Sequence, residues 1–140
     1  MGVKPWIVPA ICMLMAALNA AAQTPAPRRI HSAGNPILAD GDYYSADPAP
    51  LVADGRLYIL AGRDEAPPDV NDFIMQEWQL LATDDVAGGE WTHYPSLLRP
   101  ERVFAWAAAG RAYAGQIVRA TDGRYYLYAP VEERDSASPD

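Results

Sequence analysis

The first hairpin signal of the chain reads Leu51-Val52-Ala53-Asp54-Gly55-Arg56-Leu57-Tyr58-Ile59-Leu60-Ala61. Asp54-Gly55 stands between two apolar runs, and this dipeptide is typical of a type I′ turn because both of its residues adopt positive φ. The second run is apolar at successive positions, so both faces of the strand are apolar and we expect it to be buried between two layers. The stretch therefore predicts an antiparallel hairpin inside a stack of sheets.

A second hairpin signal follows 68 residues later, at Asp122-Gly123. Its flanking runs are 116–119 and 124–129, and both hairpins contain the pattern Asp-Gly-Arg-x-Tyr-x-x-Ala. We interpret the pair as an internal repeat, although two unrelated hairpins can share a common turn. A unit of about four short strands with a long insertion is typical of a β-propeller blade.

Two further strands are expected between the hairpins, at 77–83 and 90–94, with a turn rich in Asp and Gly between them. Residues 95–100 read as a connection. The stretch Ser45-Ala46-Asp47-Pro48-Ala49-Pro50 is expected to precede the first strand, which places Asp47 at the entrance to the hairpin. One complete blade and two strands of the next are thus predicted.

The beginning of the chain has the pattern of a secretory signal peptide over residues 1–22. Lys4 precedes the apolar run Trp6–Leu18, and small residues end at Ala22. A membrane anchor is the weaker alternative, because the apolar run is shorter than the ~20 residues of a span and contains Pro9. We therefore expect cleavage after Ala22, a secreted or periplasmic protein, a linker over 23–34 and one domain over 35–140.

Composition excludes several kinds of site and partner. The only cysteine, Cys12, lies in the predicted signal peptide, so disulfides and cysteine-zinc sites are not expected in the mature chain. Neither His31 nor His93 has metal-ligand spacing, and no cofactor or metal is expected. The net charge is −7, and loss of Lys4 makes it one unit more negative. This argues against nucleic acid and anionic membranes as partners and favours a neutral ligand.

The motifs, taken in order, resemble the start of a known enzyme family. They are Asn35-Pro36-Ile37-Leu38, Tyr44-Ser45-Ala46-Asp47-Pro48, Asp54-Gly55-Arg56-Leu57-Tyr58-Ile59-Leu60, Gly62-Arg63-Asp64-Glu65, Trp78 to Asp85 with Trp91, and Trp106 with Tyr113-Ala114-Gly115-Gln116. Over residues 35–131 this order resembles the family 43 glycoside hydrolases, which include β-xylosidases, α-L-arabinofuranosidases and arabinanases. The resemblance implies an all-β fold, a five-bladed β-propeller of which about the first one and a half blades are present.

The resemblance also implies a reaction. Such enzymes invert the configuration at the sugar, and Asp47 matches the Asp that serves as their general base. The general acid Glu and the Asp that tunes its pKa would lie beyond residue 140, so we expect residues 1–140 alone to be an inactive N-terminal fragment. The expected substrates are plant cell-wall oligosaccharides or polysaccharides such as xylan, cleaved at xylosides or arabinofuranosides. Arg63 and Tyr113 depart from the usual His and Trp, which bears on the choice of sugar.

Other residues are candidates for sugar contact. Asp64 and Glu65 follow a buried strand and either line the pocket or form a solvated loop edge. Phe104, Trp106 and Tyr113 either form an apolar wall for a sugar ring or belong to the core. Gln116 begins an inner strand and could bond a sugar hydroxyl, whereas Glu132, Glu133 and Asp135 read as a solvated tail.

Each of these functional readings has a plainer alternative. Asp47 before Pro48 can simply initiate a turn. The alternative to a hydrolase is a non-catalytic propeller that binds carbohydrate or a protein.

Overall fold

The computed structural model describes residues 25–32 and 34–134. The predicted signal peptide, with Cys12, and Asp135 of the acidic tail lie outside these residues. The described chain contains strands and one short helix. In order they are β1 (Arg28–His31), β2 (Tyr44–Ala53), β3 (Arg56–Asp64), β4 (Met75–Thr83), β5 (Glu90–Leu98), α1 (Pro100–Val103), β6 (Gln116–Arg119) and β7 (Tyr125–Tyr128).

The first predicted hairpin is confirmed as β2 and β3. Asp54 and Gly55 occupy its two-residue turn with φ of 51° and 76°, as a type I′ turn requires. The strand β2 nevertheless begins at Tyr44, earlier than expected. The prediction that Asp47 precedes the strand is therefore wrong: Asp47 lies inside β2, where the pairing with β3 is interrupted and then resumes.

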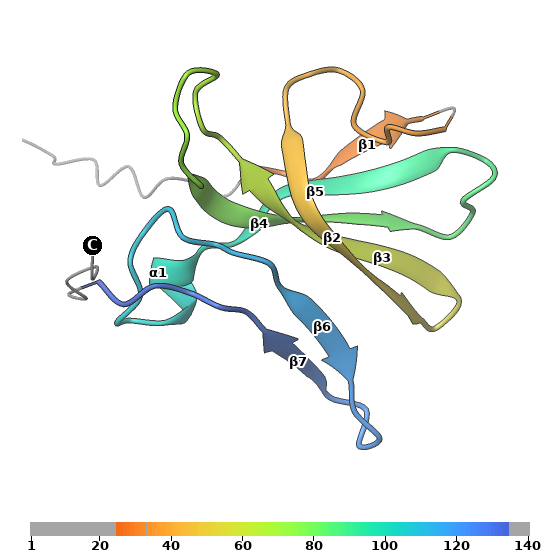
Figure 1. Cartoon of the computed structure of the whole chain (residues 1–140). Coiled ribbons are helices and arrows are strands. Elements are labelled where there is room, and N and C mark those ends of the chain that lie inside the picture. The colour runs from red at the N-terminus through yellow and green to blue at the C-terminus, as the bar shows by residue number, and fades with distance from the viewer. Residues whose placement is uncertain (1–24, 33, 135–140) are drawn as a thin grey trace, which may run out of the picture.

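The strands β4 and β5 complete an antiparallel sheet in the order β1-β5-β4-β3-β2 (Figure 1). Both were predicted, but β5 continues past the expected end at Tyr94 to Leu98. It passes Pro95 because the register shifts between the Leu80–Tyr94 and Trp78–Leu98 pairs. A proline is tolerated at such an irregularity, since it has no N–H to contribute to the ladder.

The edge strand β1 was not predicted. It pairs with β5, Arg28 opposite His93 and Ile30 opposite Trp91, and Ser32 N donates to Gly89 O at 2.8 Å. The linker predicted over 23–34 is therefore wrong for Arg28–His31. The four residues include three charged or titratable side chains and no apolar period, so main-chain pairing holds a strand that the pattern did not reveal.

The second predicted hairpin is confirmed as β6 and β7. Its turn differs from the first, because Ala120 N donates to Arg124 O and Gly123 N to Ala120 O, at 2.9 and 3.0 Å. This is a three-residue loop in which Gly123, with φ of 82°, takes the left-handed position. The shared Asp-Gly thus occupies two different turns, and the likeness of the two hairpins lies in their strands.

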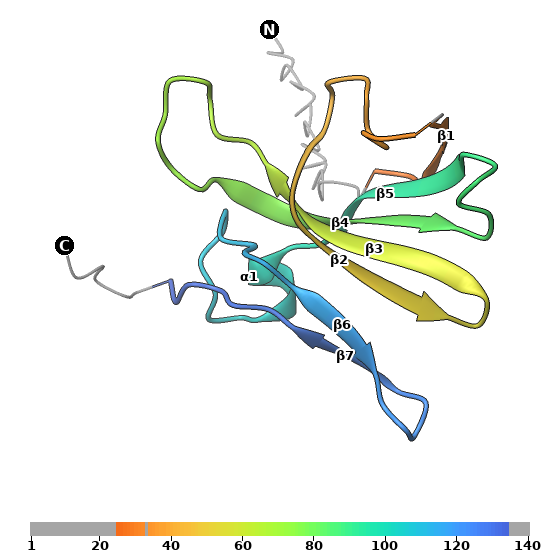
Figure 2. The ribbon, with the colours of Figure 1, turned by 45° about the vertical axis from the view of Figure 1, so that its right-hand side comes forward.

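The second hairpin packs on one face of the first sheet. In both views β6 and β7 lie beside β2, and β2 and β6 are in contact (Figures 1 and 2). The core between them contains Leu60, Met75, Trp78 and Ala112, with Ile117 and Leu127 packed against it. The indole nitrogen of Trp78 also donates to Tyr113 O at 2.7 Å. The predicted stacking of antiparallel sheets is confirmed.

The all-β class is confirmed, with α1 as a short connection after β5. The sheets of the described residues do not close on themselves, so the five blades remain a prediction. Within 25–32 and 34–134, we find no helix with the length and hydrophobicity that crossing a membrane requires.

Candidate functional site

Asp47 lies in a β-bulge at the free edge of the five-stranded sheet. Ala46 pairs with Gly62 and Ala49 with Leu60, so Asp47 and Pro48 together oppose the single residue Ala61. Within the described part of the chain, β2 has a neighbouring strand on one side only, and Asp47 is exposed. A bulge bends the strand and re-aims a side chain, and bulges are enriched beside active sites.

The backbone of Asp47 is left-handed, with φ of 51°. Residues other than glycine rarely adopt this conformation, and aspartate is among the few that tolerate it. Strained backbone of this kind persists where the surrounding structure holds it, often at functional sites. Here the β2–β3 pairing on both sides of the bulge keeps the Asp47 backbone in this conformation. Pro48 adds a fixed φ and no N–H at the free edge, which suits an edge strand.

The end of β3 brings three charged side chains opposite the start of β2. Ser45 pairs with Arg63 and Tyr44 with Asp64, two and three residues before Asp47. The guanidinium of Arg63 binds Glu65 at 3.1 Å, and Asp64 Oδ1 accepts from Ala66 N at 3.2 Å. Asp64 and Glu65 are therefore placed beside the strand that carries Asp47, each with a partner of its own. Their contact with a sugar remains a prediction.

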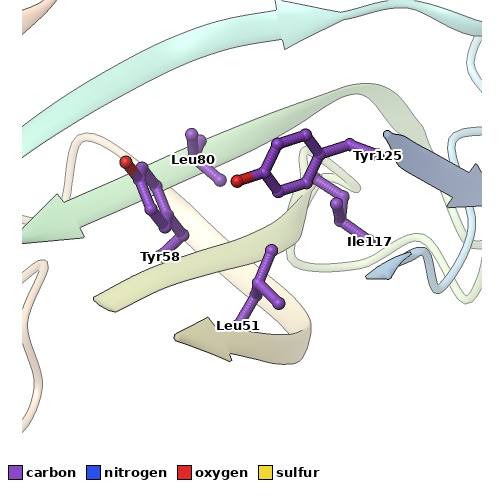
Figure 3. A pocket seen from close by; sticks show the side chains of 5 residues that line it. All are labelled: Leu51, Tyr58, Leu80, Ile117 and Tyr125. Carbon is purple, nitrogen blue, oxygen red and sulfur yellow. The ribbon is translucent and has the colours of Figure 1, made fainter. Parts of the chain in front are cut away.

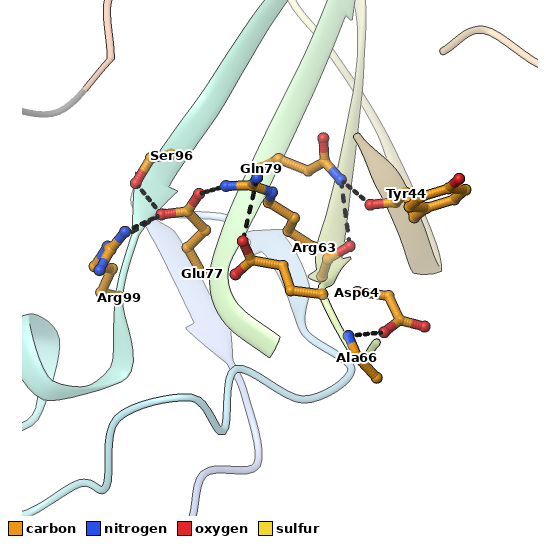
Figure 4. Close-up of polar contacts among 10 residues, drawn as sticks. Tyr44, Arg63, Asp64, Ala66, Glu77, Gln79, Ser96 and Arg99 are labelled. Atoms are coloured by element: carbon orange, nitrogen blue, oxygen red, sulfur yellow. Dashed lines mark hydrogen bonds and ion pairs between the residues drawn. The ribbon is translucent and has the colours of Figure 1, made fainter. Parts of the chain in front are cut away.

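A buried carboxylate, Glu77 on β4, supports this end of the sheet (Figure 4). It is 1% exposed and accepts hydrogen bonds from Arg63 at 3.0 Å, Arg99 at 2.8 Å and Ser96. Burial alone raises the pKa of Glu77, but the bonds from Ser96, Arg63 and Arg99 outweigh it and hold the pKa below its usual value. Glu77 is thus an ionised anchor for Arg63, which reaches from it to Glu65.

Gln79, two residues along β4, lies on the same face as Glu77. Its side-chain nitrogen donates to Tyr44 O at 3.0 Å and to Gly62 O at 3.3 Å, which ties β2 to β3 just before the bulge (Figure 4). His93 Nε2 lies 2.8 Å from Gln79 Oε1. Both side chains are fully buried, so His93 lies in the interior of the sheet and not in solvent.

Sequence reasoning missed Glu77 and Gln79. The signal was present, because two polar residues alternate with Trp78 and Leu80 in a strand that is otherwise apolar. On a strand this spacing puts both polar side chains on one face, and a buried polar face requires partners. The partners Arg63, Ser96 and Arg99 come from β3 and from the end of β5 and beyond, and they could not be assigned without the sheet register.

The predicted aromatic wall is only partly assembled. The rings of Phe104 and Trp106 lie 5.5 Å apart, and Trp106 is 53% exposed. The Tyr113 hydroxyl instead donates to Glu132 Oε2 at 3.4 Å. Gln116 is exposed, and its side-chain nitrogen donates to Ile117 O. Glu132 also binds Arg111 at 2.9 Å, so it is part of an ion pair and not free in a solvated tail. None of these contacts includes Asp47.

A separate cavity of about 300 Å³ lies between the first sheet and the second hairpin. It is lined by Leu51, Tyr58, Leu80, Ile117 and Tyr125 (Figure 3). Arg119 on β6 binds Asp54 at 2.8 Å and so joins the tips of the two hairpins. No predicted site residue lines this cavity. It is a feature of the packing between the two sheets. Across residues 25–32 and 34–134 no cluster of three or more His, Cys, Asp or Glu side chains could hold a metal ion.

No family model matches the chain. A xylosidase/arabinosidase of Bacteroides ovatus is 37% identical over 103 residues, which are 70% of this chain and 30% of that protein. The chain thus spans about a third of this relative.

Solved structures of two GH43 enzymes are similar to a comparable share of this chain. A GH43 β-xylosidase/α-arabinofuranosidase from a compost microbial metagenome, in complex with xylotriose, is 27% identical with a TM-score of 0.58, over 79% of this chain and 32% of that one. A GH43 enzyme of Xanthomonas citri complexed with xylose is 26% identical with a TM-score of 0.56, over 67% and 26%. The resemblance to part of the family 43 glycoside hydrolases is thereby confirmed in both sequence and fold.

Proposed function

We propose that this chain carries the general base of a secreted or periplasmic glycoside hydrolase that cleaves xylosides or arabinofuranosides with inversion. The observation that supports this proposal most strongly is the bulge at Asp47. A left-handed aspartate, followed by proline, lies exposed at the free edge of an otherwise regular sheet. Backbone strain of this kind clusters at functional sites, and the β2–β3 pairing on both sides of the bulge maintains it here.

The chemistry of inversion fits an exposed carboxylate that has no strong partner. One carboxylate must take a proton from water while a carboxylic acid protonates the leaving oxygen, and the two lie ~6.5 to 9.5 Å apart so that water fits between them. Among the described residues no hydrogen bond or ion pair engages the Asp47 side chain. Its oxygens are therefore available to accept a proton. The general acid and the Asp that tunes its pKa belong, on this proposal, to chain beyond residue 140.

The substrate proposal draws on the related structures. The metagenome enzyme was solved with xylotriose and the Xanthomonas citri enzyme with xylose. Arg63, Asp64 and Glu65, which lie at the end of β3 near the bulge, are polar side chains that could contact sugar hydroxyls. Secretion is proposed because of the pattern of residues 1–22.

The test is Asp47→Asn in the full-length protein. The change keeps size and shape but removes the proton acceptor, and a general base contributes ~10² to 10⁴-fold in rate. We expect kcat for aryl β-xylosides or aryl α-arabinofuranosides to fall by that factor while sugar affinity changes little. Hydrolysis rates and equilibrium binding are measured on the same samples.

Asp54→Asn is the matched control. Asp54 has the same φ of 51° in the turn of the same hairpin, so it undergoes the same change at the same backbone angle. Its activity should stay within a few-fold of wild type. Equal activity of the Asp47 variant and wild type would reject the role of base, and a wild-type protein that binds xylo-oligosaccharide without cleaving it would favour a binding module.

A further inference from the structure

His93 lies fully buried between the edge strand β1 and the centre of the sheet. Its Nδ1 accepts a hydrogen bond from Arg28 Nε at 3.1 Å, and its Nε2 lies 2.8 Å from Gln79 Oε1. The nitrogen of the Gln79 amide is already committed as a donor to two carbonyl oxygens, so Oε1 is an acceptor. The proton of His93 therefore stays on Nε2, and Nδ1 keeps its lone pair.

Arg28 joins three parts of the structure around that lone pair. It belongs to β1, binds Asp40 at 3.3 Å and Asp42 at 4.0 Å, and lies over the Tyr43 ring at 4.9 Å. The Tyr43 ring in turn meets His93 edge-on at 5.1 Å. The Arg28–His93 contact thus ties the segment 40–43 to the sheet and adds a side-chain bond to the main-chain pairing of β1 with β5.

We propose that His93 is a proton-operated latch that holds β1 and the segment 40–43 on the sheet. A proton on Nδ1 turns the acceptor into a donor that faces the donor of Arg28, and it adds a positive charge beside the guanidinium. The contact cannot survive that change, because Arg28 has no acceptor to offer. Opening releases the outer edge of the sheet and leaves β2 to β5 paired.

The surroundings of the ring set the direction of the response. Burial lowers the pKa of His93 first, the Arg28 and Arg63 cations lower it further, and Asp40 raises it, to give a pKa of about 4. Charged and titratable groups on β1, in the segment before β2, and on β3 and β4 either lie around the ring or bind the cations beside it. These are Arg28, Asp40, Asp42, Tyr43, Arg63 and Glu77, the last of these bound to Arg63.

The latched state binds a proton less readily than the open state, in which an exposed histidine has a pKa near 6.5. Acid therefore favours opening. The latch is fully closed above pH ~6.5, and the opening equilibrium rises as the pH falls towards 4. The separation of the two pKa values gives a rise of about a hundredfold between pH 7 and pH 4.

Hydrogen exchange of the chain measures this opening without any need for activity. At low micromolar concentration, and after correction for intrinsic exchange rates, the peptide over residues 25–32 should lose protection about a hundredfold from pH 7 to pH 4. The peptide over 56–64 should stay protected. Loss of protection in both peptides at the same pH would indicate global unfolding and overturn the latch.

Two variants separate the effect of a proton on His93 from the effect of a proton on a neighbouring carboxylate. His93→Gln cannot take up a proton but can still meet Arg28 and Gln79, so the acid response of β1 should disappear. If the response persists in His93→Gln, protonation of Asp40 or Asp42 is its cause and the proposal fails. His31→Gln, an exposed position on β1 itself, is the matched control and should keep the response.

Arg28→Met tests the same contact if His93→Gln does not fold. Without the guanidinium β1 keeps its main-chain pairing with β5 but loses its side-chain bond to the ring. β1 should therefore exchange faster than in wild type already at pH 7, and its exchange should no longer depend on His93. Protection of β1 equal to wild type in this variant would overturn the proposal.

Discussion

Glu77 shows how a single residue organises one end of the sheet. Two arginines and a serine converge on a carboxylate that is almost fully buried. A buried charge of this kind is tolerated because every oxygen has a partner, and removal of the charge leaves several donors unpaired.

We expect Glu77→Gln to lower the free energy of unfolding by roughly 2 to 3 kcal/mol, towards the lower part of the range for broken buried pairs because Arg63 and Arg99 can reach water. Urea unfolding of wild type and variant at pH 7 measures this difference in the free energy of unfolding. Asp69→Asn, an exposed loop position, is the control and should change stability by less than about 0.5 kcal/mol. A variant as stable as wild type would show that the three donors find other acceptors.

The same site predicts a dependence on pH. The pKa of Glu77 is lowered in the folded chain, so its contribution is complete above the pKa of an unfolded carboxyl group and is lost as the pH falls through the lower, folded value. The gap in stability between wild type and Glu77→Gln should therefore narrow below pH ~4. A constant gap between pH 7 and pH 3 would contradict the lowered pKa.

The sequence indicated which residue is the candidate base, but it did not indicate the backbone conformation of that residue. Asp47 was singled out by its neighbours in the chain, but its bulge depends on two residues of β2 facing one residue of β3. That count is a property of the pairing, which no stretch of one strand contains.

The first hairpin is the element that sequence predicts best, because its turn is specified by adjacent residues. Gly55 has φ of 76° in the turn, with open space around it, whereas Gly34 has no positive φ and also lies in open space. Gly55→Ala should lower stability by about 1 kcal/mol through backbone strain alone, and Gly34→Ala should change it little. Urea midpoints of the two variants measure the difference, and equal midpoints would show that the turn carries no strain.

The elements that sequence missed depend on distant partners. The edge strand β1 is four residues long, and its partner His93 lies 65 residues from Arg28. The second half of β5 was hidden by Pro95, which is normally read as a strand breaker but here lies at a shift of register. Local propensity is informative for a tight turn and uninformative for strand pairings between residues so far apart in the sequence.

Residues 25–32 and 34–134, taken together, leave large side chains of the second hairpin exposed. Tyr125, Tyr126 and Tyr128 are 51%, 41% and 64% exposed, and among the described strands β7 is paired only with β6. A two-stranded sheet is marginal by itself, and an open edge beside apolar side chains is a template for association.

We expect the chain without residues 1–22 to bind a hydrophobic dye and to self-associate as its concentration rises. Tyr126→Lys should reduce both effects, since a charge on an edge strand opposes pairing with another chain. Val86→Lys, in an exposed turn away from β7, is the control and should leave them unchanged. A monomeric sample with a sharp cooperative melt and no dye binding would show that the hairpin is adequately covered.

The position of β1 has a consequence for the order of events during biosynthesis. Of the strands in this sheet, β1 leaves the ribosome first, yet it pairs with β5, the last of them to be made. At ~5 to 20 residues per second, the chain needs roughly 3 to 13 seconds to grow by the 65 positions from Arg28 to His93. For that time β1 has no partner strand, whereas β2, β3 and β4 can pair as soon as each emerges. The first strand of the sheet to be made is therefore the last to join it.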